Sequence, residues 1–229
     1  MPDVLTPHLI LASRSPRRRE LMALLGLPFE VWPVDVPEEQ LPGEPPAAVP
    51  ERLSREKARA AAEQVGEGIV VAADTVVVHR GAILGKPRDP DEARAMLRRL
   101  RGERHRVLTG VTVMDAALGK QITELCETLV WLRAMSDEEI AAYVASGDPL
   151  DKAAAYAIQN ATFAPVERVV GCPANVMGLP MCHVVRNLRR LGVEIPPNAR
   201  PARCVVRYGG YYCAIADIAM PGAAQTPLP

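Results

Sequence analysis

The sequence predicts an α/β fold, and three observations support that prediction. Short apolar runs rich in β-branched residues alternate with longer stretches whose apolar residues recur at helical spacing. Helix-capping residues precede two of those stretches, at Ser15-Pro16 and at Ser136-Asp-Glu-Glu139. The run 69–78 holds eight apolar residues, five of them Val, as expected for a strand that is covered on both faces.

The composition describes a soluble globular protein of 229 residues, long enough for one large or two small lobes. Its 27 basic and 27 acidic residues cancel, so charge gives no reason to expect nucleic acid or an anionic membrane as a partner. No apolar run approaches membrane-spanning length. The first residues lack a basic start followed by an apolar core, so we expect no signal peptide and a cytoplasmic location.

The first strand and helix of the chain predict an anion-binding site. A strand at 8–12 leads through a short loop into a helix over 16–25, with Ser15 as its cap and Gly26 after its end. Backbone N–H groups at such a helix start bind anions well. Residues 17–19 are all Arg, which is unfavourable at this end of the helix dipole unless a phosphate lies there. The alternative is a solvated basic turn.

The remaining elements follow in order. A loop over 35–50 carries Asp35, Glu38, Glu39 and Glu44. A short link predicts that strands 105–115, interrupted at Thr109-Gly110, and 122–132 pair antiparallel. Further strands are expected at 29–34, 82–84 and 163–170, helices at 48–64, 90–100 (capped by Asp89 or Asp91), 137–147 and 181–191, and a turn at 175–180.

The end of the chain differs in character. We expect one domain over 1–195, with two lobes around a cleft, and an extension over 196–229 that opens with Pro and carries Cys204 and Cys213. The odd count of five Cys argues against a disulfide framework. Cys172 and Cys182 with those two could instead meet at a metal or form redox pairs, although their spacing matches no common zinc pattern.

Two charged residues lie on faces that should be apolar. Asp74 interrupts the run 69–78, and a carboxylate there is costly unless it meets a cation, a metal or good donors. Either the strand delivers Asp74 into a cleft, or it reaches the sheet edge and turns Asp74 to water. Lys57 lies on the inner stripe of its helix, four residues after Leu53, and either extends to water or enters a cleft.

The candidate site residues combine donors and cations with carboxylates, a combination that suits a polyphosphate bound with Mg²⁺ or Mn²⁺. A carboxylate near a metal can accept the proton of an attacking water, and cations stabilise the charge on the phosphates. The phosphate loop of ordinary ATPases is missing from the sequence. The donors and cations are Ser13, Arg17, Arg18, Lys57 and Lys86; the carboxylates are Glu38 and Asp74; a polar loop adds Asp151, Lys152 and Gln159.

Seven motifs together resemble the Maf family of nucleotide pyrophosphatases, also called septum-formation inhibitor proteins. The resemblance covers residues 8–192, with the motifs in family order and at family-like spacing. They are Ser13-Arg-Ser-Pro-Arg-Arg-Arg-Glu-Leu, Glu56-Lys-Ala, Ala73-Asp-Thr-Val-Val, Gly85-Lys-Pro, Thr109-Gly-Val, Pro149-Leu-Asp-Lys-Ala-Ala-Ala-Tyr-Ala-Ile-Gln and Gly178-Leu-Pro.

The resemblance implies a mixed, strongly bent β-sheet flanked by helices around a central cleft, distantly like inosine-triphosphate pyrophosphatases. It implies hydrolysis of nucleoside triphosphates at the α-phosphorus with a divalent metal, and a homodimer. Asp74 would be the proton acceptor, with Glu38 beside it at the metal. Ser13, Arg18, Lys57 and Lys86 fall at the phosphate-contacting positions of the family.

Three further positions resemble the subgroup that hydrolyses dTTP and UTP: Arg17, Thr75 and Gln159. A hydroxyl and an amide can pair with the edge of uracil or thymine. One departure lies beside them, because the family's Tyr-Gly-Ile-Gln-Gly is Tyr156-Ala-Ile-Gln-Asn160 here, which reshapes the loop near the base. Two alternatives stay open: a broader pyrophosphatase for non-standard nucleotides, and a non-catalytic nucleotide-binding regulator of division.

Overall fold

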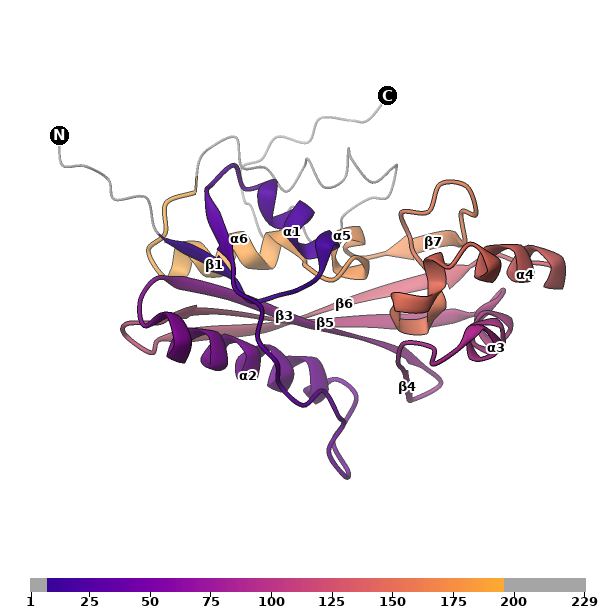
Figure 1. Cartoon of the computed structure of the whole chain (residues 1–229), viewed down its shortest axis with the longest axis horizontal. Helices are drawn as coiled ribbons and strands as arrows, with labels where there is room; N and C mark the ends of the chain where they lie inside the picture. Colours follow the sequence, from indigo (N-terminus) through magenta and orange to yellow (C-terminus); the bar gives the residue numbers. More distant parts are fainter. Residues whose placement is uncertain (1–7, 196–229) are drawn as a thin grey trace.

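The computed structural model describes residues 8–195, and it shows a mixed seven-stranded sheet with helices on both faces (Figure 1). The strand order is β2-β1-β3-β5-β6-β7, and β4 pairs with β3 off this path. β1 runs parallel to β2 and β3, whereas the other pairs are antiparallel. The strands are β1 (Leu9–Leu11), β2 (Phe29–Val31), β3 (Ile69–His79), β4 (Ala82–Leu84), β5 (Arg104–Asp115), β6 (Gln121–Leu132) and β7 (Val166–Val170). The α/β prediction and the antiparallel pairing of β5 with β6 are confirmed.

The helices divide between the two faces of the sheet (Figure 1). α2 covers one face, α1, α5 and α6 cover the other, and α3 packs on α4 at one end. They are α1 (Pro16–Ala23), α2 (Ala48–Val65), α3 (Pro90–Leu100), α4 (Asp137–Ala145), α5 (Pro173–Val176) and α6 (Met181–Arg190), with 3₁₀ turns η1 (Asp148–Asp151) and η2 (Ala153–Ala155).

β3 is the central strand, and its alternating residues serve two cores. Val71 and Ala73 pack with residues of α1 and α6, whereas Val70 and Ala72 pack with Ala residues of α2. All four are buried, and burying one Val side chain contributes about 1.5–3 kcal/mol. The prediction of a strand covered on both faces is therefore confirmed, and Asp74 lies in the interior of the sheet rather than at its edge.

The predicted interruption of the strand at Thr109-Gly110 is wrong. β5 runs unbroken through both residues, which pair with Thr75 and Asp74. A Cβ at Gly110 would lie 2.1 Å from the Pro50 carbonyl oxygen. Glycine is present because the first turn of α2 packs directly on β5, not because the strand breaks.

Several element boundaries differ from their predictions by a few residues. α1 ends at Ala23 rather than 25. The amides of Leu24 and Leu25 donate to carbonyls only three residues back, which tightens the last turn, and Gly26 then takes a φ of 67°. β2 ends at Val31 rather than 34, and β7 begins at Val166 rather than 163. Residues 173–176 form a short helix, which overlaps the start of the turn that was expected at 175–180.

The capping predictions are confirmed. Ser15 accepts a hydrogen bond from the Arg18 amide, and Ser136 forms a complete capping box with Glu139. Asp89, not Asp91, caps α3. Each such cap contributes about 1 kcal/mol to helix stability.

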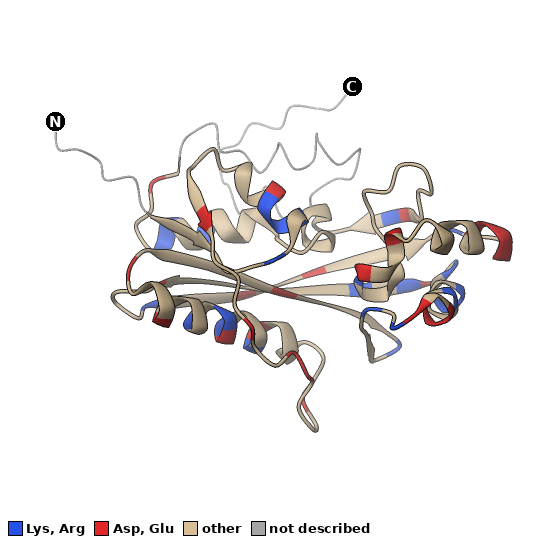
Figure 2. Cartoon of the chain, viewed as in Figure 1, with Lys and Arg blue, Asp and Glu red and all other residues tan. Residues whose placement is uncertain are grey.

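Cys172, just before α5, and Cys182, on α6, lie in the core, whereas the extension with Cys204 and Cys213 lies outside the described residues. Between residues 8 and 195 no three His, Cys, Asp or Glu side chains gather as a metal site. Over the same range no helix is long and apolar enough to cross a membrane. Acidic and basic residues are interspersed along the ribbon (Figure 2).

Candidate active site

A cleft of about 640 Å³ opens beside the middle of β3. The loop from β1 to α1, the segment after β2, and the segments around η1, η2 and α5 form its walls. Every site residue predicted from the sequence lines this one cleft: Ser13, Arg17, Arg18, Glu38, Lys57, Asp74, Thr75, Lys86 and Gln159.

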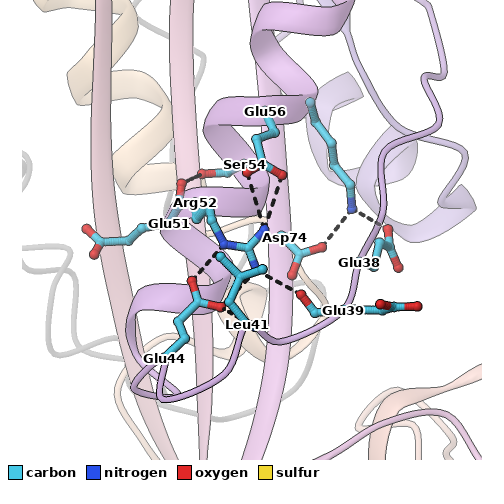
Figure 3. Close-up of polar contacts among 10 residues, drawn as sticks. Glu38, Glu39, Leu41, Glu44, Glu51, Arg52, Ser54, Glu56 and Asp74 are labelled. Carbon is cyan, nitrogen blue, oxygen red and sulfur yellow. Dashed lines mark hydrogen bonds and ion pairs between the residues drawn. The ribbon is translucent and has the colours of Figure 1, made fainter.

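Lys57 joins the two carboxylates of the site, which Figure 3 labels as Glu38 and Asp74. Its Nζ donates to Asp74 Oδ1 at 2.7 Å and to Glu38 Oε1 at 2.5 Å. Asp74 is 6% exposed and Lys57 7%. Both open alternatives are thereby decided: Asp74 meets a cation instead of turning to water, and Lys57 enters the cleft instead of leaving it.

The charge state of Glu38 is set by its cationic neighbours. Partial burial raises the pKa of its carboxyl, but the hydrogen bond and charge of Lys57, with the charges of Lys86 and Arg18, outweigh burial. The pKa of Glu38 therefore lies below its ordinary value, and the side chain is an anion near neutral pH. Lys86 has no ion-pair partner among residues 8–195, which leaves its ammonium available to a ligand.

Arg18 is a half-buried cation that donates hydrogen bonds to neutral groups. Its guanidinium donates to Gly178 O at 2.8 Å, Thr75 Oγ1 at 3.1 Å and Ser13 Oγ at 3.4 Å. Burial lowers the pKa of Arg18, and the charges of Asp74 and Glu38 oppose that effect. Within the described chain no carboxylate lies at ion-pair distance from it, so its charge is available to an anion in the cleft.

The hydroxyl of Thr75 has a fixed hydrogen-bond direction. Arg18 can only donate to it, and at the other end Thr109 Oγ1 donates to the Asn175 carbonyl at 3.2 Å. Thr109 must then accept the Thr75 proton across the 2.9 Å contact between the two hydroxyls. Thr75 keeps one lone pair, so it can only accept from a ligand. The sequence placed Thr109 in a motif but gave it no role.

The loop near Gln159 is held partly by Asp148 and Tyr143, which the sequence did not single out. Asp148 Oδ2 accepts from Tyr143 Oη at 2.7 Å and from Asn160 Nδ2 at 2.9 Å. Lys152 donates to the Asp148 carbonyl and to Asp151 Oδ1. Asn160 also accepts from the Phe163 amide, so the residue that replaces the family's Gly closes this loop. Arg17 reaches toward the same loop, with its Nη1 3.8 Å from Asp151 Oδ2.

The donor set fits a hard divalent cation. Carboxylate oxygens of Glu38 and Asp74 converge on a single point, now held by the Lys57 ammonium. Mg²⁺ is typically held by one or two carboxylates together with waters and substrate phosphates. The chemistry of two converging carboxylates beside Arg18 and Lys86 therefore fits a polyphosphate carried with a divalent cation.

Comparison with known proteins agrees with a cleft for a polyphosphate. It also shows that the chain belongs to the Maf family. The family described as "Maf-like protein" matches residues 8–191. The chain is 51% identical over 194 residues to a dTTP/UTP pyrophosphatase of Anaeromyxobacter dehalogenans, covering 84% of this chain and 98% of that protein. Proteins of the same name from Geobacter sulfurreducens (48% over 185 residues, 81% and 97% covered) and Methanosarcina barkeri (45% over 189 residues, 82% and 96% covered) are also similar.

Proposed function

We propose that this chain is a nucleoside triphosphate pyrophosphatase that hydrolyses dTTP and UTP to the monophosphate and pyrophosphate. The observation that carries the proposal is the position of Asp74, buried on the central strand and facing the cleft beside Lys57, Glu38 and Arg18. The proposal is also supported by relatives named dTTP/UTP pyrophosphatases, because this chain aligns with almost their full length.

The proposed chemistry is attack of a water at the α-phosphorus. Asp74 accepts the proton of that water, a role that requires a carboxylate within hydrogen-bond reach. Ser13, Arg18, Lys57 and Lys86 bind the phosphate oxygens. Because Ser13, Arg18 and Lys57 are already held by hydrogen bonds in the folded cleft, they stabilise the charge that develops on the phosphates without reorganising.

Glu38 and Asp74 would hold the divalent cation, Mg²⁺ or Mn²⁺. When bound, the cation polarises phosphate oxygens and draws the substrate into position. Lys57 must then share its two carboxylates with the cation, and its ammonium gains phosphate oxygens as partners. The same side chain thus keeps the carboxylates together before the substrate arrives.

Base selection is assigned to Arg17, Thr75 and Gln159. Thr75 offers only an acceptor, because its proton is directed to Thr109. Uracil and thymine carry an N–H at the ring position where cytosine carries an acceptor, so Thr75 would favour the first two. The Gln159 amide offers a donor and an acceptor, and it lines the same cleft.

The test compares hydrolysis of dTTP, UTP, CTP, ITP and 7-methyl-GTP with Mg²⁺ or Mn²⁺, with the products identified. We expect pyrophosphate as product, and kcat/KM values for dTTP and UTP at least about 10-fold above the others. Release of orthophosphate would refute attack at the α-phosphorus. Equal rates on ITP would favour the broader housekeeping enzyme, and stable UTP binding without turnover would favour the regulator of division.

A cytoplasmic location and a homodimer belong to the same proposal, as does the division of the chain at residue 195. The homodimer rests on the family resemblance. Light scattering on the purified protein tests the dimer: a mass of about 50 kDa is expected, twice that of the 24.8 kDa chain, and 24.8 kDa would contradict it.

A further inference from the structure

Glu38 lies on a segment that has no regular structure of its own. Residues 32–47 connect β2 to α2 without a helix or strand. Glu38 nevertheless reaches Lys57 Nζ at 2.5 Å. Ordering an unsupported residue costs about 1–2 kcal/mol in backbone entropy, so something must hold this segment beside α2.

Arg52 (Figure 3) holds the segment in place, and it lies five residues before Lys57 on the same helix. Its Nε and Nη2 donate to the two carboxylate oxygens of Glu44 at 2.7 and 2.8 Å. Nη2 also donates to the carbonyl of Glu39 at 2.9 Å, and Nη1 contacts the Glu56 carboxylate at 3.2 Å. Glu39 is the residue next to Glu38, so this contact fixes the backbone that carries the carboxylate.

Glu44 in turn closes the tip of the segment. Its Oε2 accepts from the Leu41 amide at 3.1 Å, its own amide donates to Leu41 O at 3.0 Å, and its carbonyl accepts from Gln40 Nε2 at 2.7 Å. The Glu44 side chain is 9% exposed and that of Arg52 19%. A bidentate pair so little exposed is geometrically specific, unlike an ordinary surface ion pair.

We propose that Arg52 is a positioning residue for the metal site: through Glu44 and the Glu39 carbonyl it holds residues 38–44 against α2 and so presents Glu38 to the divalent cation. This inference rests on the proposed function for the role of Glu38. Arg52 itself does not line the cleft, so its effect is carried by the segment. Lys cannot replace it, because an ammonium lacks the planar fork that engages both Glu44 oxygens and a carbonyl.

The first experiment needs neither metal nor substrate. Amide hydrogen exchange is measured on the full chain and on Arg52→Lys, with Arg106→Lys as the matched control. Arg106 makes the same kind of bidentate pair with Glu127, at 2.7 and 2.8 Å, but between β5 and β6 and outside the cleft lining. We expect the Leu41 and Glu44 amides to exchange at least about 10-fold faster in Arg52→Lys alone, because loss of a held contact lowers local protection.

The second experiment measures the Mn²⁺ concentration that half-activates UTP hydrolysis. Loss of a residue that orients a metal ligand typically costs 10–100-fold in metal affinity, so we expect a rise of that size in Arg52→Lys and none in Arg106→Lys. Saturating Mn²⁺ should restore kcat to within a few-fold. The double variant Arg52→Lys with Glu44→Gln should be no worse than the more impaired single variant, because both act through one contact.

Three results would overturn the inference: unchanged exchange at residues 38–44, faster exchange with an unchanged Mn²⁺ requirement, or faster exchange spread evenly over the chain. The last would make Arg52 a general stability residue. A full chain that hydrolyses no nucleotide would refute the proposed function instead, and the exchange comparison would still decide whether Arg52 holds the segment.

Discussion

Replacing Gly110 with Ala should disturb both the stability of the protein and its site. Gly110 pairs with Asp74 across β3 and β5, and the first turn of α2 lies against it. The new Cβ would meet Pro50 O at 2.1 Å and Glu51 N at 2.6 Å. These are backbone atoms, so no side chain can turn aside, and α2 must retreat until the 2.1 Å distance reaches at least 3.4 Å, a shift of more than 1 Å.

The magnitude follows from this clash. Overpacking a well-packed core costs about 1–3 kcal/mol, and a clash with backbone should fall at about 3 kcal/mol. For a chain of this size that lowers the Tm by about 6–12 °C. α2 also carries Lys57 and Arg52, and a misplacement of about 1 Å can cost about 100-fold in rate.

The assay is thermal unfolding followed by circular dichroism, with kcat/KM for UTP measured at a temperature where the variant is folded. Gly85→Ala is the stability control, because Gly85 has open space around it and no positive φ. If Gly110→Ala matches the full chain in Tm to within 2 °C and keeps its rate, α2 does not pack on β5 as described.

Three further predictions address other contacts. Glu44→Gln should lower the stability of the protein at pH 7. The hydrogen bond from Arg52 lowers the pKa of Glu44 to about 2 in the folded protein, against 4.5 in the unfolded chain. The stability that ionised Glu44 contributes is therefore fully present above pH 4.5 and is lost as the pH falls toward 2. The wild-type advantage in urea unfolding should therefore shrink over that window, and a constant difference would refute the pairing. Thr109→Val removes the hydroxyl that donates to the buried Asn175 carbonyl and accepts from Thr75. It should cost about 1–3 kcal/mol of stability and lower the ratio of kcat/KM for UTP to that for CTP. An unchanged ratio would contradict the fixed hydrogen-bond direction of the Thr75 hydroxyl. Asn160→Ala should destabilise by about 1–2 kcal/mol and raise KM for UTP more than it lowers kcat, whereas an effect on kcat alone would contradict a role in the base-side loop.

Much of this architecture could be predicted because its signals are local. The β3 strand follows from a dense run of Val, and the caps at Ser15 and Ser136 act within three residues. The site residues could be listed because they fall in motifs, and all of them reach one cleft. The order of the strands needed the structure, since β1 lies beside β3 although 57 residues separate their ends.

The contacts between distant segments could not be predicted. Whether Lys57 enters the cleft depends on how α2 packs against β3, and both outcomes fit its place on an amphipathic helix. Gly110 suggested a break because glycine weakens a strand, but the close approach of α2 overrides that preference. Arg52 and Glu44 are ordinary charged residues in sequence, and only the fold reveals that they share a bidentate pair.

The most direct test of the central claim is the single-turnover rate of UTP hydrolysis by Asp74→Asn. Asn keeps the size of the side chain, and Glu38 still pairs with Lys57. At saturating Mn²⁺ we expect UTP to bind within a few-fold of the wild-type affinity while hydrolysis falls by about 10²–10⁴-fold, the range that a positioned general base supplies. A folded Asp74→Asn protein that releases pyrophosphate at a rate near that of the wild type would contradict the assignment of Asp74 as proton acceptor.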